Sequence, residues 1–243
     1  MKAMILAAGL GTRLMPLTSD RPKALVEVEG KTLLEHCIGN LIAQGFDHIV
    51  INVHHFAPKI YEFLSQHKFN ASIYVSDETD RLLDTGGGII HARQFLDGEE
   101  PFLVHNVDII SDINLKDLID THIQSKSLAT LAVNRRESSR VFLFDEEMQL
   151  AGWRNMLTGR SIFPNMHKTL YEAYAFAGIH VISPEIFNLI TTKGVFSIVD
   201  AYLNLCKDNK ILGVSLPDNF ILDVGKPDSL NRAKEFFLTR QCQ

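Results

Sequence analysis

The chain has 243 residues, of which 46% are hydrophobic and 22% are charged, and its formal net charge is −5. This balance is typical of a globular protein with a substantial core, and the length fits one large domain. The negative charge argues against nucleic acid as a partner, and the absence of an apolar run of 18 residues argues against a membrane span.

The first expected strand, residues 3–7, leads into a segment that combines glycine with positive charge. Gly9 and Gly11 lack a Cβ, so the backbone there can turn sharply and approach a ligand closely. Successive N–H groups in such a turn form a cradle for anions. Arg13 adds a bidentate fork and Lys23 a point charge, and both suit phosphate oxygens. The segment therefore predicts a triphosphate site.

Two other phosphate-binding patterns do not fit. The dinucleotide fingerprint requires a third glycine where this chain has Leu14, and the Walker pattern requires a glycine where it has Leu25. A second glycine cluster at 86–88 lacks the residues that would complete either pattern.

The rest of the first half alternates between strand and helix patterns. Further strands are expected at 48–53, 71–76, 102–106 and 128–134, and helices at 32–44, 57–66, 88–96 and 114–125. Such apolar strands, separated by helices, predict a mostly parallel sheet that is covered on both faces.

The second half changes character. Residues 141–145 and 149–153 flank an acidic turn and predict a hairpin, and 154–170 read as a loop or flap. The remaining expected elements are a strand at 174–181, a short helix opening at Ser183, a helix at 197–207, strands at 211–215 and 220–223, and a helix from Pro227 to about Leu238. We therefore expect one three-layer α/β/α, Rossmann-like domain with a mostly parallel central sheet and an antiparallel excursion.

Two aspartates follow apolar strands. Asp108 comes just after the strand at 102–106, and Asp223 ends the strand at 220–223. Ligands of open α/β sheets bind at the carboxyl ends of the strands, which places the glycine turn, residues 86–88 and Asp108 in one cleft. Mg²⁺ typically takes one or two protein carboxylates and completes its shell with water and phosphate oxygen.

The cysteines and histidines give no sign of a metal or redox site. Cys37, Cys206 and Cys242 are an odd number at unrelated spacings, which predicts free thiols and a cytoplasmic protein. The ten histidines show no metal-ligand spacing, and His54 and His55 are interpreted as surface or packing residues.

Residues 6–14, 16–18 and 22–25 together resemble the signature of the sugar-nucleotide pyrophosphorylases. These nucleotidyltransferases join a nucleoside triphosphate to a sugar 1-phosphate. Further similar blocks lie at 49–52, 85–89, 101–104, 176–179 and 222–225, and residues 135–172 match poorly. The likeness is greatest to members that use UTP and N-acetylmuramate 1-phosphate in peptidoglycan recycling. The plausible competitor is a GTP-dependent member acting on mannose or heptose 1-phosphate.

The resemblance implies a role for each matching residue. Arg13 and Lys23 would be catalytic, and Asp108 and Asp223 would hold Mg²⁺, with Mn²⁺ as a substitute. The nucleotide would contact Leu6, Ala7, Ala8, Gly9, Gly11, Thr12, Arg13, Lys23, Gly86 and Gly87, and the sugar would contact Asn106, Glu172 and Gly178. Within one domain over 1–243, residues 1–134 would mainly bind nucleotide, 135–226 the sugar phosphate, and 227–243 would form a C-terminal helix.

This chain departs from the family pattern in three places. Val107 stands where the family usually has glycine, and Lys226 where threonine is common. The glutamate–lysine pair of thymidylyl relatives is here Glu172-Ala173, so the lysine for the sugar phosphate is missing. Its candidate replacements are Lys168, Arg154 and Arg160.

Two further classes remain as alternatives. Asn106-Val107-Asp108 also resembles the Asp-x-Asp element of metal-dependent glycosyltransferases, although these enzymes have no need of a pyrophosphate cradle. A catalytically silent nucleotide-binding regulator is the other class, and the intact Arg13, Lys23, Asp108 and Asp223 argue against it. We expect a monomer or a small homo-oligomer.

Overall fold

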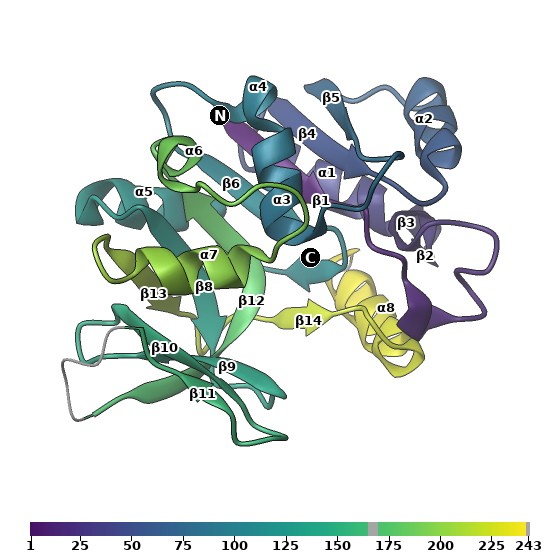
Figure 1. The fold of residues 1–243 in the computed structure, drawn as a ribbon. Coiled ribbons are helices and arrows are strands. Elements are labelled where there is room, and N and C mark those ends of the chain that lie inside the picture. The colour runs from purple at the N-terminus through teal and green to yellow at the C-terminus, as the bar shows by residue number, and fades with distance from the viewer. Residues whose placement is uncertain (165–169, 242–243) are drawn as a thin grey trace.

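A computed structural model describes residues 1–164 and 170–241, and strands from both halves of the chain share its main sheet (Figure 1). The strands are β1 (Lys2–Leu6), β2 (Glu27–Val28), β3 (Lys31–Thr32), β4 (His48–Val53), β5 (Ser72–Asp77), β6 (Phe102–Asn106), β7 (Ile109–Ser111), β8 (Ala129–Asn134), β9 (Arg140–Phe144), β10 (Leu150–Asn155), β11 (Ser161–Ile162), β12 (Glu172–Ile182), β13 (Ile211–Ser215) and β14 (Ile221–Asp223). The helices are α1 (Leu33–Ala43), α2 (Ala57–Gln66), α3 (Asp84–His91), α4 (Arg93–Leu96), α5 (Leu115–Ser125), α6 (Ile186–Leu189), α7 (Ile198–Leu205) and α8 (Pro227–Gln241).

The main sheet has a parallel part and an antiparallel part. Strands β6, β1, β4 and β5 are neighbours in that order and run parallel. The long strand β12 pairs antiparallel with β6, β8 and β9, and the antiparallel order then continues through β10 and β11. Strand β13 joins β8 in parallel. The predicted fold class, a mostly parallel sheet with an antiparallel excursion, is confirmed.

Helices cover both faces of the parallel part. One core cluster joins α1, α2 and α5 to one face, and a second joins α3, α4, α6 and α7 to the other. Strand β1 serves both clusters because its side chains alternate: Ala3 and Ile5 belong to the first, and Met4 to the second. The apolar strand patterns thus correspond to strands that are buried from both sides.

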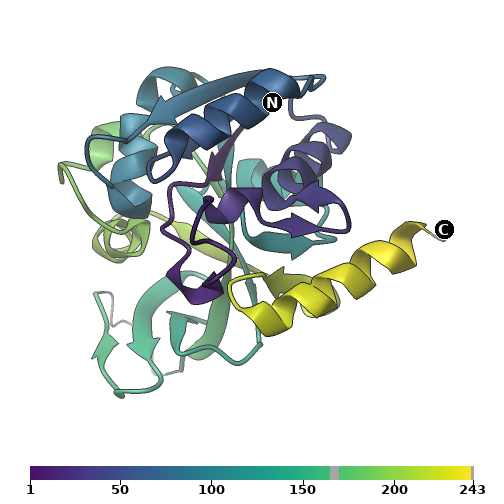
Figure 2. The same cartoon turned by 90° about the vertical axis from the view of Figure 1, so that its right-hand side faces the viewer.

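A third core cluster lies under the segment that follows β1. Leu14 from this segment is fully buried with Val224 and with Ala233 of α8. Phe236 of α8 also stacks on Phe220, with ring centroids 4.3 Å apart. Figure 2 shows α8 in yellow, with the C-terminus at its outer end. The last helix therefore supports the glycine turn from a distant part of the sequence.

Three features differ from the sequence-based expectation. Helix α3 begins at Asp84 and contains the glycine cluster, because close packing there overrides the low helix propensity of glycine. The segment expected to be a loop includes the end of β10 and the strand β11. The short strands β2, β3 and β7 escaped prediction, because two or three residues carry no readable periodicity.

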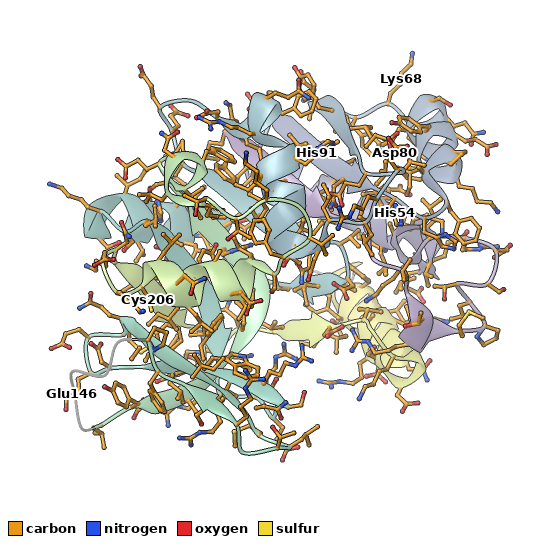
Figure 3. The ribbon with its side chains drawn as sticks, viewed as in Figure 1. His54, Lys68, Asp80, His91, Glu146 and Cys206 are labelled. Atoms are coloured by element: carbon orange, nitrogen blue, oxygen red, sulfur yellow. The ribbon has the colours of Figure 1, made fainter. Side chains whose placement is uncertain are left out.

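Both cysteines in the described ranges are buried. Cys37 lies in α1, and Cys206 directly follows α7 (Figure 3). The third cysteine, Cys242, is outside the described residues. Across the two described ranges, no helix is both long enough and apolar enough to cross a lipid bilayer.

We predict that acid weakens the fold before its carboxylates titrate. Burial lowers the pKa of His105 from 6.5 to about 4 and that of His180 to about 3. Between about pH 6.5 and 4 the unfolded chain therefore binds more protons than the folded chain, so stability falls as the pH is lowered. The expected slope is up to about 1.4 kcal/mol per pH unit for each histidine. Urea unfolding at pH 7.5, 6.5 and 5.5 measures it, and an unchanged free energy of unfolding would contradict it.

Candidate active site

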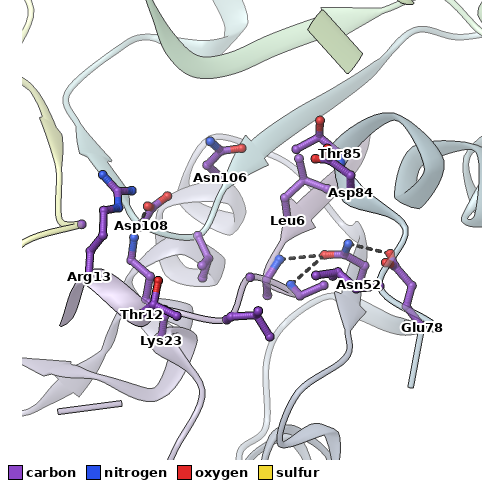
Figure 4. A pocket seen from close by; sticks show the side chains of 18 of the residues that line it. Leu6, Thr12, Arg13, Lys23, Asn52, Glu78, Asp84, Thr85, Asn106 and Asp108 are labelled. Carbon is purple, nitrogen blue, oxygen red and sulfur yellow. Dashed lines mark hydrogen bonds and ion pairs between the residues drawn. The ribbon is translucent and has the colours of Figure 1, made fainter. Parts of the chain in front are cut away.

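A cavity of about 540 Å³ lies at the carboxyl ends of β1 and β6 (Figure 4). It is lined by most of the residues that the sequence singled out: Leu6, Ala7, Ala8, Gly9, Gly11, Thr12, Arg13, Lys23, Asn106 and Asp108. Figure 4 shows two ends, with Arg13, Lys23 and Asp108 at one and Asn52, Glu78 and Thr85 at the other. The cationic groups are thus gathered at one end.

Gly11 has a conformation and a position that require glycine. Its φ is +67°, and a Cβ there would lie 3.1 Å from both the Cβ of Lys23 and the Cγ2 of Thr18. The Thr18 hydroxyl also donates to the Gly11 carbonyl oxygen at 2.9 Å. The turn therefore packs directly against the backbone that carries Lys23, which brings both segments of the predicted phosphate site together.

Asn52 holds the end of β1, and the sequence analysis did not assign it a role. Its Oδ1 accepts hydrogen bonds from the backbone N–H of Ala7 at 2.7 Å and of Ala8 at 3.3 Å. Its Nδ2 donates to Glu78 Oε1 at 2.7 Å. The available signals were a polar residue near the end of the apolar strand β4 and its place in the family-like block 49–52; its side chain is buried beside β1.

Glu78 is a buried carboxylate that serves the same end of the cavity. Only 3% of the residue is exposed, and its Oε2 accepts from the backbone N–H of Leu83 at 3.1 Å. Its carbonyl oxygen contacts Nδ1 of His54 at 2.7 Å, a residue labelled in Figure 3. A Cβ on Gly88 would lie 2.7 Å from Glu78 Oε1 and 3.0 Å from Asn52 Nδ2. Glycine at 88 therefore makes room for the Asn52–Glu78 pair.

Lys23 and Asp108 form an ion pair at the other end of the cavity. Their side chains are only 11% and 16% exposed, so the pair is poorly screened by water. Arg13 lines the same cavity without an ion-pair partner among the described residues. Arg13 can therefore bind an anion at this end of the cavity. The carboxylate of Asp108 lies at the same end and is paired with Lys23.

Asp223 comes close to this end through the pairing of β14 with β7. That register sets Asp223 opposite Ile109, and the next N–H, of Val224, donates to the Asp108 carbonyl oxygen at 2.8 Å. Oδ1 of Asp223 is buried and has no hydrogen-bond partner in the described structure. A Cβ on Gly225 would lie 2.5 Å from that oxygen and 2.9 Å from Arg13 Nη2. Asp223 thus lies beside Arg13 with one carboxylate oxygen unsatisfied.

The second glycine cluster lies behind the cavity and does not line it. A Cβ on Gly86 would lie 2.4 Å from Phe196, and one on Gly87 would lie 2.3 Å from the Gly194 carbonyl oxygen. Both glycine N–H groups donate to the Phe196 carbonyl oxygen, at 2.9 and 3.2 Å. These glycines therefore allow α3 to pack closely on the segment that precedes α7.

Of the three residues expected to contact the sugar, Asn106 lines the cavity, and Gly178 and Glu172 do not. Gly178 adjoins the cavity indirectly, because a Cβ there would lie 2.7 Å from the amide of Asn106, which lines it. Glu172 does not line the cavity; it is exposed and pairs with Arg135 at 2.5 Å and with the Tyr174 hydroxyl at 2.7 Å. Lys168, one candidate for the sugar phosphate, lies outside the described residues.

Two contacts of a kind used in nucleophilic catalysis are structural here. Cys37 Sγ lies 3.5 Å from His105 Nδ1, but burial raises the pKa of the thiol well above its usual value, so no thiolate forms at neutral pH. Ser183 Oγ lies 3.0 Å from His122 Nε2, yet the hydroxyl donates to the Ser127 carbonyl oxygen at 3.0 Å. The hydroxyl proton of Ser183 is therefore directed at the Ser127 carbonyl oxygen and not at His122.

Comparison with known proteins places the chain among enzymes. A family model described as nucleotidyl transferase matches residues 2–240. The chain is 33% identical to an N-acetylmuramate alpha-1-phosphate uridylyltransferase of Caulobacter vibrioides, with 93% of each protein covered. It is 30% identical to a mannose-1-phosphate guanyltransferase of Gibberella zeae, and covers 61% of that protein with 93% of its own length. A crystal structure of HddC from Yersinia pseudotuberculosis complexed with GMP-PN shares the fold, with a TM-score of 0.77, 21% identity, and 97% of this chain and 99% of that one covered.

We predict that Gly88→Ala weakens the fold by disturbing the Asn52–Glu78 pair. Alanine in a helix is usually about 1 kcal/mol better than glycine, but here its Cβ would collide with two buried polar atoms. A strained or broken buried hydrogen bond costs about 1–3 kcal/mol. Gly39→Ala in α1 is the matched control, because its Cβ would meet nothing within 4 Å. Urea unfolding of both variants tests this, and equal stability of the two would refute it.

Proposed function

Because the chain belongs to the nucleotidyl transferase family, we propose that this sugar-1-phosphate nucleotidyltransferase joins UTP to N-acetylmuramate 1-phosphate and releases pyrophosphate. One observation carries the proposal. The turn after β1, Arg13 and the Lys23–Asp108 pair gather at one end of a cavity that is large enough for a nucleotide. The opposite end, at Glu78 and Thr85, leaves room for the base.

The reaction needs charge control more than proton transfer. An oxygen of the sugar phosphate forms a bond to the α-phosphorus of UTP, and the bond from that phosphorus to the bridging oxygen of pyrophosphate breaks. The attacking oxygen is already ionised at neutral pH, so no general base is required. The main barrier is bringing two anions together in line, which positioning and fixed positive charge overcome.

Arg13 and Lys23 supply that fixed positive charge. Arg13 is free to bind the departing pyrophosphate with a planar fork of donors. Lys23 pairs with Asp108 and can turn its ammonium group toward the α-phosphate when the nucleotide enters. Both side chains reach the cavity from segments that Gly11 packs together, so their charges meet at one place.

The two carboxylates fit a Mg²⁺ ion held jointly with phosphates. No group of three or more histidine, cysteine or acidic side chains in the described ranges could hold a metal alone. Mg²⁺ needs only one or two carboxylates when phosphate oxygens and water complete its shell. The unsatisfied Oδ1 of Asp223 and the carboxylate of Asp108 are the groups that would hold it. When bound, the ion would neutralise phosphate charge and orient the phosphates.

The choice of UTP and a muramate sugar rests on the relatives. The uridylyltransferase of Caulobacter vibrioides matches this chain along nearly the full length of both. The chain spans about three fifths of the matched guanyltransferase. GTP with mannose 1-phosphate is the second candidate, because that relative is nearly as similar in identity.

A substrate panel tests the proposed function. We expect pyrophosphate release to be fastest with UTP and N-acetylmuramate 1-phosphate when the four common triphosphates are paired with several sugar 1-phosphates. The measured quantity is kcat/KM for each pair. A tenfold preference for GTP with mannose 1-phosphate would replace the substrates, and no release with any pair would remove the activity itself.

Removing either cation should slow the chemical step. We expect Arg13→Ala and Lys23→Ala each to lower kcat by about 10²–10³, because each deletes a charge that stabilises the transition state. Lys116→Ala, an exposed lysine on α5, is the control and should retain full turnover. Circular dichroism verifies folding, and wild-type turnover in both cation variants would rule out these roles.

Removing the metal or its carboxylates should abolish activity. We expect no turnover in excess chelator, and recovery when Mg²⁺ or Mn²⁺ is restored. Asp108→Asn and Asp223→Asn should each lose activity while the fold persists, and the exposed Asp120→Asn should not. Full turnover in excess chelator would show that the carboxylates have another purpose.

A further inference from the structure

A second cavity, of about 440 Å³, lies between α7 and the antiparallel strands β9, β10 and β11. None of its residues lines the first cavity. Its lining combines aromatic rings with two arginines and one acid: the principal residues are Phe142, Trp153, Phe176, Arg140, Arg160 and Asp200. Phe142 belongs to the second core cluster, and Trp153 and Phe176 pack against that cluster, so the cavity borders the core, with the two arginines and the aspartate as its charged groups.

The chemistry of the lining suits a sugar that carries a negative charge. Aromatic faces such as Trp153 and Phe176 present flat apolar surface, against which a pyranose ring can pack. Neither Arg140 nor Arg160 has an ion-pair partner among the described residues, so both guanidinium groups are available to a carboxylate. Asp200 can accept hydrogen bonds from sugar hydroxyl or amide groups. Two arginines against one aspartate leave a single net positive charge, which matches one carboxylate.

Two stretches of backbone place this cavity next to the first. Val195 lines the first cavity, and Ser197, only two residues later, lines the second. Phe176 lines the second cavity, and Gly178, two residues later on β12, packs on Asn106 of the first. Two residues of extended chain span about 7 Å. The linings of the two cavities are therefore adjacent at two places.

We propose that the second cavity receives the carboxylate-bearing substituent of the acceptor sugar, with Arg140 and Arg160 binding the carboxylate. This rests on the proposed function, and it makes the enzyme selective for an acidic amino sugar. N-acetylmuramate is N-acetylglucosamine with a lactyl ether, so the two differ by the group that these arginines would bind. The 1-phosphates of hexoses without a carboxylate would leave both arginines without a partner in this cavity.

The test compares these two sugars in the full-length chain. Initial rates with UTP are measured for N-acetylmuramate 1-phosphate and N-acetylglucosamine 1-phosphate, in wild type and in Arg140→Gln and Arg160→Gln. We expect wild type to prefer the muramate substrate, and each variant to lower that preference about 10–100-fold, mainly by raising KM. Arg140→Lys and Arg160→Lys should recover part of the preference because the charge remains. Arg232→Gln, an exposed arginine of α8, is the matched control.

Each result distinguishes this inference from the proposed function. Equal losses for both sugars would overturn the carboxylate role, and so would a wild-type enzyme that uses both sugars equally. No turnover of any sugar phosphate would instead remove the proposed function. A measurement on wild type alone guards against misfolded variants: free N-acetylmuramate should inhibit at least tenfold more strongly than free N-acetylglucosamine. Equal inhibition would also overturn the inference.

Discussion

The carboxamide of Asn52 joins three segments that are far apart in the chain. It accepts hydrogen bonds from two backbone N–H groups just after β1 and donates one hydrogen bond to Glu78. The N–H groups that leave β1 would otherwise be buried without partners, at a cost comparable to a lost hydrogen bond each. Glu78 in turn takes the N–H of Leu83 just before α3, so the position of α3 depends on the same pair. The backbone at the end of β1, which lines the cavity, and the start of α3 therefore both depend on the buried Asn52–Glu78 contact. Gly88 has no side chain that would collide with this contact.

At the other end of the cavity, the decisive quantity is charge. The protein as a whole is negative, yet Arg13 and Lys23 both line the same end of the cavity. Asp108 and Asp223, which keeps one oxygen unsatisfied, add two carboxylates nearby, so two positive and two negative side chains lie close together at this end of the cavity. In the proposed reaction the nucleotide would bring several negative charges and Mg²⁺ two positive ones. The Lys23–Asp108 ion pair would then be exchanged for contacts with the substrates, in surroundings where charge is only weakly screened.

Much of the fold was readable from the sequence because its signals are local. Apolar runs of five or six residues predicted the central strands, and the glycine turn with Arg13 and Lys23 predicted the cationic end of the cavity. The Asn52–Glu78 pair was not readable, because it joins positions 26 residues apart and neither residue type is unusual at the end of a strand. The glycines of α3 suggested only a contact with a ligand, whereas in the structure their lack of side chains also lets a helix meet the backbone at Gly194. Contacts between segments far apart in the chain leave no periodic pattern in the sequence, so they could not be predicted from it.

Strand β12 has a further consequence. Its first three residues pair with β9 in the antiparallel part of the main sheet, and its last four pair with β6 in the parallel part. One continuous strand thus joins the two parts, while the glycine turn after β1 and the Asn52 contact belong to the parallel part alone. Side chains on β9, β10 and β11 can change without altering a hydrogen bond of that turn. With the acceptor sugar bound as proposed, substitutions in β9, β10 and β11 would change the choice of acceptor during evolution while the turn after β1 stayed unchanged.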